Sequence, residues 1–116
     1  MNLNKIDYLE FATTDIAASK GFFTDAFGWA FEDYGPEYSA FMNQGLDGGF
    51  FKADKVATTE EGAPLTVFYT DAIESVLSKV EAAGGKVTKP IFDFPGGRRF
   101  QFLEPGGNEL AVWTDK

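Results

Sequence analysis

The sequence predicts an α+β fold, in which two βαβββ modules form a cupped, mixed β-sheet with the helices on its outer face. Three observations favour this fold. The order strand–helix–strand–strand–strand occurs twice in the 116 residues. The halves repeat with a period of 56 residues, since Thr14-Asp15 matches Thr70-Asp71 (71 − 15) and Gly28 matches Gly84 (84 − 28). The chain closes with an alternating hairpin, which is not stable without further strands beside it.

The first module begins with a strand over residues 6–11, in which Tyr8 and Glu10 share a face because side chains alternate. A helix over 16–27 follows, with N-cap candidates directly before it. Gly28 suits the left-handed conformation that commonly ends a helix. Three further strands are expected over 29–34, 38–43 and 49–53.

The second module repeats this order. A strand over 65–69 places Leu65, Val67 and Tyr69 on one face. Glu74 comes three residues after Asp71, which indicates a capping box at the start of a helix. Apolar residues at helical spacing continue that helix to the glycines at 84 and 85, and a strand interrupted by a proline is expected within 86–94.

The hairpin consists of strands over 98–103 and 109–114, joined by a turn over 104–108 that is rich in proline, glycine and asparagine. Phe100 and Phe102 share one face of its first strand, and Arg99 and Gln101 share the other. In its second strand one face carries three residues together: Glu109, Ala111 and Trp113.

The length fits a single domain over residues 1–116, with modules at 1–53 and 65–116 and a linker at 54–64. The linker is polar, which is typical of a flexible connection without a function of its own. The net charge is −8 and no basic patch emerges, so nucleic acid is not expected as a partner. The 13 Phe, 4 Tyr and 2 Trp residues are enough to build a sizeable core.

The chain contains neither cysteine nor histidine. Disulfides, thiolate nucleophiles, Ser-His-Asp catalysis and metal sites built on Cys or His are therefore excluded. Acid–base chemistry would have to use Asp, Glu, Tyr or Lys. No signal-peptide core and no long apolar run is present, so we expect a cytoplasmic protein without a membrane partner.

Three segments together resemble a known superfamily: 15–29, with Gly21-Phe-Phe-Thr-Asp-Ala-Phe-Gly-Trp29 at its end, 80–87 (Val-Glu-Ala-Ala-Gly-Gly-Lys-Val) and 103–108 (Leu-Glu-Pro-Gly-Gly-Asn). In this order they resemble the vicinal oxygen chelate superfamily, which includes glyoxalase I, bleomycin-resistance proteins, fosfomycin-resistance enzymes and extradiol dioxygenases. The resemblance covers the whole chain, and it implies a glyoxalase-like fold and a homodimer. Trp29 and Phe51 are then candidates for dimer contacts or for pocket lining.

Metal-dependent members of this superfamily hold a divalent ion inside the cup. The resemblance places their ligand positions on Tyr8, Leu65 and Ala111, with a fourth near Gly49 to Phe51 whose register the sequence does not fix. Leucine and alanine have no donor atom, and a neutral phenol is a poor ligand. We therefore expect no metal, no other cofactor and none of the metal-dependent activities.

The predicted ligand pocket is the set of residues that alternation places on the cup side: Tyr8, Glu10, Leu65, Val67, Tyr69, Gln101, Glu109, Ala111 and Trp113. Arg99 is near this set but fits a surface position better. Glu10 is the candidate catalytic residue, because a carboxylate among aromatic side chains would be desolvated and suited to act as a base or a counter-ion.

Three functions stay open at this point. The favoured one is a metal-free protein, similar to the bleomycin-resistance type, that binds and sequesters a small cationic or aromatic molecule. The alternative is a lyase or isomerase that moves a proton with Glu10 and either Tyr8 or Tyr69. The third is a structural or regulatory module without a specific ligand. Whether the chain is an enzyme at all is not decided by its sequence.

Overall fold

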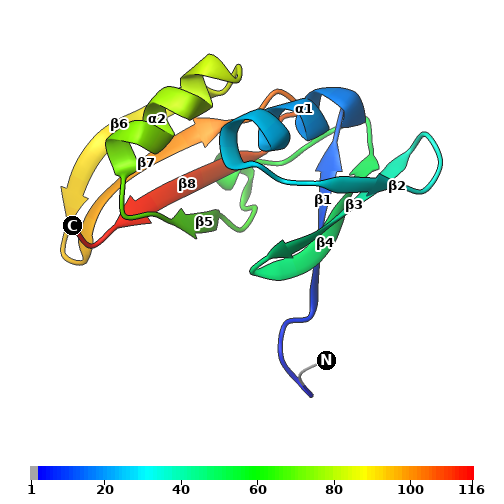
Figure 1. The fold of residues 1–116 in the computed structure, drawn as a ribbon, viewed down its shortest axis with the longest axis horizontal. Helices are drawn as coiled ribbons and strands as arrows, with labels where there is room; N and C mark the ends of the chain where they lie inside the picture. The colour runs from blue at the N-terminus through cyan, green and yellow to red at the C-terminus, as the bar shows by residue number, and fades with distance from the viewer. Residues whose placement is uncertain (1–2) are drawn as a thin grey trace.

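Each half of the chain forms one βαβββ module, as predicted, in a computed structural model that describes residues 3–116. Figure 1 shows both helices on one side of the molecule and the two sheets on the other. The first module contains β1 (Tyr8–Thr13), α1 (Ile16–Phe27), β2 (Phe31–Asp33), β3 (Tyr38–Gln44) and β4 (Leu46–Lys52). The second contains β5 (Thr66–Tyr69), α2 (Ile73–Ala82), β6 (Lys86–Phe94), β7 (Gly97–Leu103) and β8 (Glu109–Thr114).

The strands form two four-stranded mixed sheets with the same topology, β1-β4-β3-β2 and β5-β8-β7-β6. The first strand of each module runs parallel to the last, and the remaining pairs are antiparallel. The parallel strands of each module are joined through the helix and the two middle strands, which supply the long crossover connection that parallel pairing needs. The predicted α+β fold class is thus confirmed.

One aromatic core joins the helices to both sheets. Phe22 of α1 packs on Phe102 of β7, with ring centroids 5.7 Å apart, and Phe23 packs on Phe50 of β4 at 5.3 Å. A single helix therefore covers parts of both modules. Trp29 is only 7% exposed and stacks on Phe23 in this core. Trp29 also borders two hollows of about 400 and 220 Å³, so the pocket lining expected of it agrees with the structure, while a dimer contact stays a prediction.

The two helices begin differently. Asp15 caps α1 by accepting a hydrogen bond from the backbone N–H of Ala18, as the sequence predicts. The capping box predicted for α2 is absent, because its N-cap residue is Ala72 and Asp71 lies one residue too early. Instead, the hydroxyl of Thr70 accepts a hydrogen bond from the N–H of Ala72, and Glu74 pairs with Arg98.

Several boundaries differ from the sequence expectation. β1 spans Tyr8–Thr13 rather than residues 6–11. β4 begins at Leu46 rather than at residue 49, and β2 is confined to Phe31–Asp33. β6 continues through Pro90, because shifts in its register with β7 between Val87 and Phe92 accommodate the missing N–H. The linker contains a short 3-10 helix, η1 (Thr59–Glu61), so it is not a structureless connection.

The turn between β7 and β8 fastens the second module to the first. The backbone N–H of Thr14 donates to the carbonyl of Gly106 at 3.1 Å. The side-chain amide of Asn108 donates to the carbonyl of Ala12 in β1 at 2.8 Å. These bonds fix β1 relative to β8. Among residues 3–116, neither helix is long and apolar enough to cross a membrane.

Candidate functional site

The helices cover one face of the β5–β8 sheet, because Phe68, Phe100, Phe102 and Leu110 pack beneath them. The alternating residues therefore lie on the other side, which we call the β5–β8 open face. It consists of Val67, Tyr69, Arg99, Gln101, Glu109, Ala111 and Trp113. Six of the nine predicted pocket residues lie here, and Arg99 joins them.

Tyr8 and Glu10 lie instead on the corresponding open face of the first sheet, with Tyr38 of β3, which the sequence analysis did not single out. The hydroxyls of Tyr8 and Tyr38 are 2.6 Å apart, and Tyr38 donates to Oε2 of Glu10 at 2.9 Å. Burial raises the pKa of the Tyr38 phenol well above its ordinary value, and these hydrogen bonds raise it further. Glu10 itself is exposed, so the desolvated setting expected for it is not present.

Eight of the nine predicted residues thus lie on two faces rather than in one enclosed cup. Leu65 immediately precedes β5 and is half-buried. The two faces meet at a crevice of about 200 Å³, to which the first sheet contributes Glu10 and the second contributes Glu109. Asn108 and the two ends of the linker complete its walls. The crevice is therefore one of the hollows that residues of both modules share.

Aromatic rings gather at one end of the β5–β8 open face. Trp113 contacts Tyr69 edge to face with centroids 5.1 Å apart, and Phe94 of β6 at 6.1 Å. The guanidinium of Arg99 lies 5.8 Å from the ring of Phe92 and 5.9 Å from that of Phe94. The sequence analysis missed both phenylalanines, although their spacing of two beyond Pro90 was a signal that they share a face.

A line of hydrogen bonds crosses the same face. Arg99 Nη2 donates to Oε1 of Gln101 at 3.3 Å, and Nε2 of Gln101 donates to Oε2 of Glu109 at 3.3 Å. The N–H of Thr59 in η1 donates to the other oxygen of Glu109 at 2.9 Å. A groove of about 440 Å³ lies beside this line, with Lys89 on its wall.

Glu109 is held as a carboxylate. Partial burial alone would raise the pKa of Glu109, but hydrogen bonds from Thr59 and Gln101 and the charge of Lys89 outweigh it, and the pKa is lowered. Both carboxylate oxygens already accept hydrogen bonds. Through the bond from Thr59, Glu109 fixes the linker to the sheet.

The residues at the expected metal-ligand positions do not fit a divalent ion. Ala111 is fully buried between Val67 and Gln101 in the strand ladder and has no donor atom. The register of β4, left open by the sequence, pairs Glu10 with Gly49, just as Val67 pairs with Ala111. The fourth position thus has no side chain. Within the described residues 3–116, no cluster of three acidic side chains that could hold a metal occurs.

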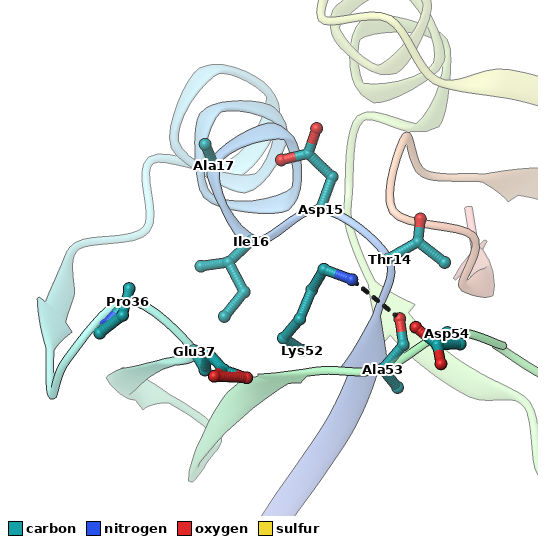
Figure 2. Close-up of a pocket in the computed structure, with 9 residues that line it drawn as sticks. All are labelled: Thr14, Asp15, Ile16, Ala17, Pro36, Glu37, Lys52, Ala53 and Asp54. Carbon is teal, nitrogen blue, oxygen red and sulfur yellow. Dashed lines mark hydrogen bonds between the residues drawn. The ribbon is translucent and has the colours of Figure 1, made fainter.

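A larger hollow of about 860 Å³ lies at the start of α1, where Lys52 stands among Asp15, Glu37 and Asp54 (Figure 2). The ammonium of Lys52 donates to the carbonyl of Ala53 at 3.4 Å, and Asp15 is occupied as the α1 cap. The hollow takes in none of the predicted pocket residues. The β5–β8 open face, with its aromatic rings and polar line, is therefore the better candidate site.

Comparisons with known sequences agree with the fold. A family model described as "Glyoxalase/Bleomycin resistance protein/Dioxygenase superfamily" matches residues 5–112. "Putative glyoxylase CFP32" of Mycobacterium tuberculosis is 31% identical over 120 residues, which cover 92% of this chain and 44% of the relative. "Anthracycline biosynthesis protein DnrV" of Streptomyces peucetius is 28% identical, with 91% and 45% covered. The chain thus spans less than half the length of these curated relatives.

Solved structures show the same architecture. A glyoxalase-related enzyme from Fulvimarina pelagi superposes with a TM-score of 0.80 at 21% identity, covering 97% of this chain and 88% of the other. A glyoxalase/bleomycin resistance protein/dioxygenase family enzyme from Burkholderia phytofirmans superposes with a TM-score of 0.79 at 18% identity, covering 96% and 100%. At these identities the likeness establishes the fold.

Proposed function

Because the chain belongs to the glyoxalase/bleomycin resistance protein/dioxygenase superfamily, we propose that it binds a small aromatic molecule on the β5–β8 open face without a metal ion. The observation that carries this proposal is the half-buried ring of Trp113, held between Tyr69 and Phe94 on a face that no helix covers. The relatives are named for a glyoxylase and for anthracycline biosynthesis. Their names point to small molecules without agreeing on a reaction.

The aromatic end is suited to stacking. Tyr69 is 52% exposed, and its hydroxyl donates to Asp115 at 2.6 Å, so its ring is exposed and yet held in one orientation. Rigid aromatic side chains lose little conformational entropy when a ligand covers them, and they offer large apolar surfaces. A flat ring placed against Trp113 and Tyr69 would gain this contact area.

Sequestration fits the side chains better than transformation on this face. The one carboxylate in the strands of the β5–β8 open face is Glu109, and both of its oxygens are already engaged. Hydrogen bonds that lower the pKa of this carboxylate make it a weaker base. The fit of the expected metal positions is also poor, since Leu65, Gly49 and Ala111 supply no donor.

A thermal-shift titration with 2-naphthamide, a neutral flat probe, tests the proposal. We expect the probe to raise the Tm of the unmodified protein, and Trp113→Ala or Tyr69→Ala to abolish the rise. Tyr34→Ala is the matched control, because Tyr34 is a 61% exposed tyrosine outside this face. Absence of any shift, or a shift that both variants retain, would contradict the proposal. A divalent ion bound in stoichiometric amount would overturn its metal-free part.

The hydrogen-bonded series Tyr8–Tyr38–Glu10 favours a second candidate, a lyase or isomerase that transfers a proton on the first sheet. Exchange of the methyl hydrogens of 2-acetylnaphthalene for deuterium, followed by NMR in D₂O, tests it. We expect Glu10→Gln to abolish exchange while binding of 2-naphthamide persists. Exchange no faster than in buffer alone would remove this candidate.

A homodimer and a cytoplasmic location remain predictions. The homodimer follows only from the resemblance, and it is tested by the molar mass in sedimentation equilibrium. A measured mass close to that of one chain, 12.7 kDa, would contradict the homodimer. The location is tested by fractionating the cells that produce the protein.

A further inference from the structure

We propose that Arg99 makes the β5–β8 open face selective for aromatic ligands that carry an anionic group, a carboxylate above all. This inference rests on the proposed function, because it names the class of ligand for the same site. It also replaces the cationic ligand that the acidic composition suggested. Its basis is the incomplete bonding of Arg99, together with the charges and rings around it.

Arg99 is half-buried and has no ion-pair partner among residues 3–116. Its side chain makes one hydrogen bond, the 3.3 Å contact with Gln101. Its Nε atom is buried and has no acceptor within the part of the chain that the structure describes. Buried donors are almost always paired in folded proteins, with the chain or with ordered water, so this one leaves a place for an acceptor from outside the chain.

The neighbouring residue Arg98, on the same strand, has partners for its guanidinium within the protein. Arg98 lies on the opposite face of β7, where it pairs with Glu74 of α2 and donates from Nε to the carbonyl of Lys116. The chain carries 18 acidic residues, yet none of those described pairs with Arg99. The missing ion-pair partner of Arg99 therefore reflects its position on the β5–β8 open face and not a shortage of acidic residues in the chain.

The acids near Arg99 are bonded to other groups and leave its guanidinium without an ion-pair partner among residues 3–116. Lys89 of β6 pairs in register with Gln101 and adds a second cation to this face. Glu109 is the acid nearest along the polar line, but its two oxygens accept from Thr59 and Gln101. Asp115, at the end of β8, is engaged by the hydroxyl of Tyr69.

The aromatic side chains on both sides of Arg99 favour a ligand whose remaining part is a flat ring. In the strand ladder Arg99 lies between Phe92 of β6 and Trp113 of β8. A flat ring lying against Trp113 would therefore present a carboxylate substituent close to the guanidinium. A guanidinium matches a carboxylate with two parallel hydrogen bonds, and these charge-assisted bonds are stronger than neutral ones.

Three probes with one ring and different charges test this inference: 2-naphthoate, 2-naphthamide and 2-naphthylmethylammonium. Their affinities for the unmodified protein are measured by isothermal titration calorimetry. We expect 2-naphthoate to bind about tenfold more tightly than 2-naphthamide, the gain typical of a hydrogen bond to a charged group. The ammonium probe should bind more weakly than either.

Arg99→Gln should remove the preference for 2-naphthoate over 2-naphthamide, measured as the ratio of their two affinities for the same variant. Arg99→Lys keeps the charge but not the planar fork, so it should keep part of the preference. Arg98→Gln is the matched control and should leave all three affinities unchanged. Should Arg99→Gln fail to fold, two measurements still test the inference. These are the relative affinities of the three probes for the unmodified protein and the same affinities for Arg99→Lys.

Failure of the inference is distinct from failure of the proposed function. Equal affinities for 2-naphthoate and 2-naphthamide, or a preference that survives Arg99→Gln, would overturn the role of Arg99 while aromatic binding stands. No binding of any of the three probes would overturn the proposed function, and this inference with it.

Discussion

The hydroxyl of Ser19 in α1 donates a 2.8 Å hydrogen bond to Oε1 of Glu104, a residue 85 positions later in the turn between β7 and β8. Glu104 is only 2% exposed. Its carboxylate also accepts from the N–H of Gly106 at 2.6 Å and from the side-chain amide of Asn108 at 2.7 Å. A buried acid thus connects the first module to the turn that fixes β8.

Replacement of Glu104 by alanine should strongly destabilise the fold. The change leaves the buried donors of Ser19, Gly106 and Asn108 without their acceptor, and each such loss is costly. We expect the free energy of unfolding, measured in urea, to fall by about 3 kcal/mol or more. Glu60→Ala in η1 is the control, because Glu60 is exposed and makes no such bonds. Equal effects of the two changes would show that the buried acid is not structurally important.

Glu104 also marks the limit of prediction from sequence. Alternation correctly placed Phe100 and Phe102 against the helices and Ala111 on the other face, because strand periodicity depends only on neighbours in the chain. The burial of Glu104 depends on Ser19, which lies in the other module. In the sequence it is indistinguishable from an ordinary acid at an exposed turn.

The candidate site was predicted in part for the same reason. Periodicity identified the faces of Tyr8 and Trp113 but not whether these faces enclose one cup, since that depends on how the two sheets are joined. Tyr38 was missed because its hydrogen bonds to Tyr8 and Glu10 cross between strands. The state of Arg99 was missed because sequence patterns do not report which charges remain unpaired.

The different N-termini of α1 and α2 predict different effects of removing the aspartate near each. Asp15 accepts a hydrogen bond at the start of α1, whereas Asp71 caps nothing. Asp15→Ala should therefore lower the free energy of unfolding by about 1 kcal/mol, the usual value for an N-cap. Asp71→Ala should change it by less than about 0.5 kcal/mol, as for an ordinary surface site. Urea denaturation of both variants measures the difference, and a larger loss for Asp71→Ala would restore the capping box that the sequence suggested.

Tyr38 should make stability depend on alkaline pH. Burial, reinforced by Tyr8 and Glu10, raises the pKa of Tyr38 above its ordinary 10.0. The folded state therefore favours the neutral phenol. This contribution is fully present below pH 10 and is lost as the pH rises from there toward the folded pKa. In urea titrations, the loss of stability above pH 10 should be smaller in Tyr38→Phe than in the unmodified protein. Tyr34 and Tyr69 also have raised pKa values, so only the difference between the two proteins reports on Tyr38. Identical pH profiles would contradict this prediction.

Gly49 stands beside Glu10, at the position where a metal-dependent relative would need a ligand from its fourth strand, and Tyr38 leaves no room for one. A Cβ at residue 49 would overlap the Tyr38 hydroxyl oxygen and would lie 2.9 Å from the carbonyl oxygen of Ser39. Gly49→Ala should therefore destabilise the protein by about 1–3 kcal/mol, as overpacking does. Gly21→Ala is the control, because a Cβ there meets open space in α1 and should be neutral or stabilising.

If the clash with Tyr38 is the cause, Gly49→Ala should cost less stability in a Tyr38→Leu background, a coupling that a double-mutant cycle in urea measures. Full additivity would show that the Ser39 backbone, rather than the tyrosine ring, excludes a side chain here.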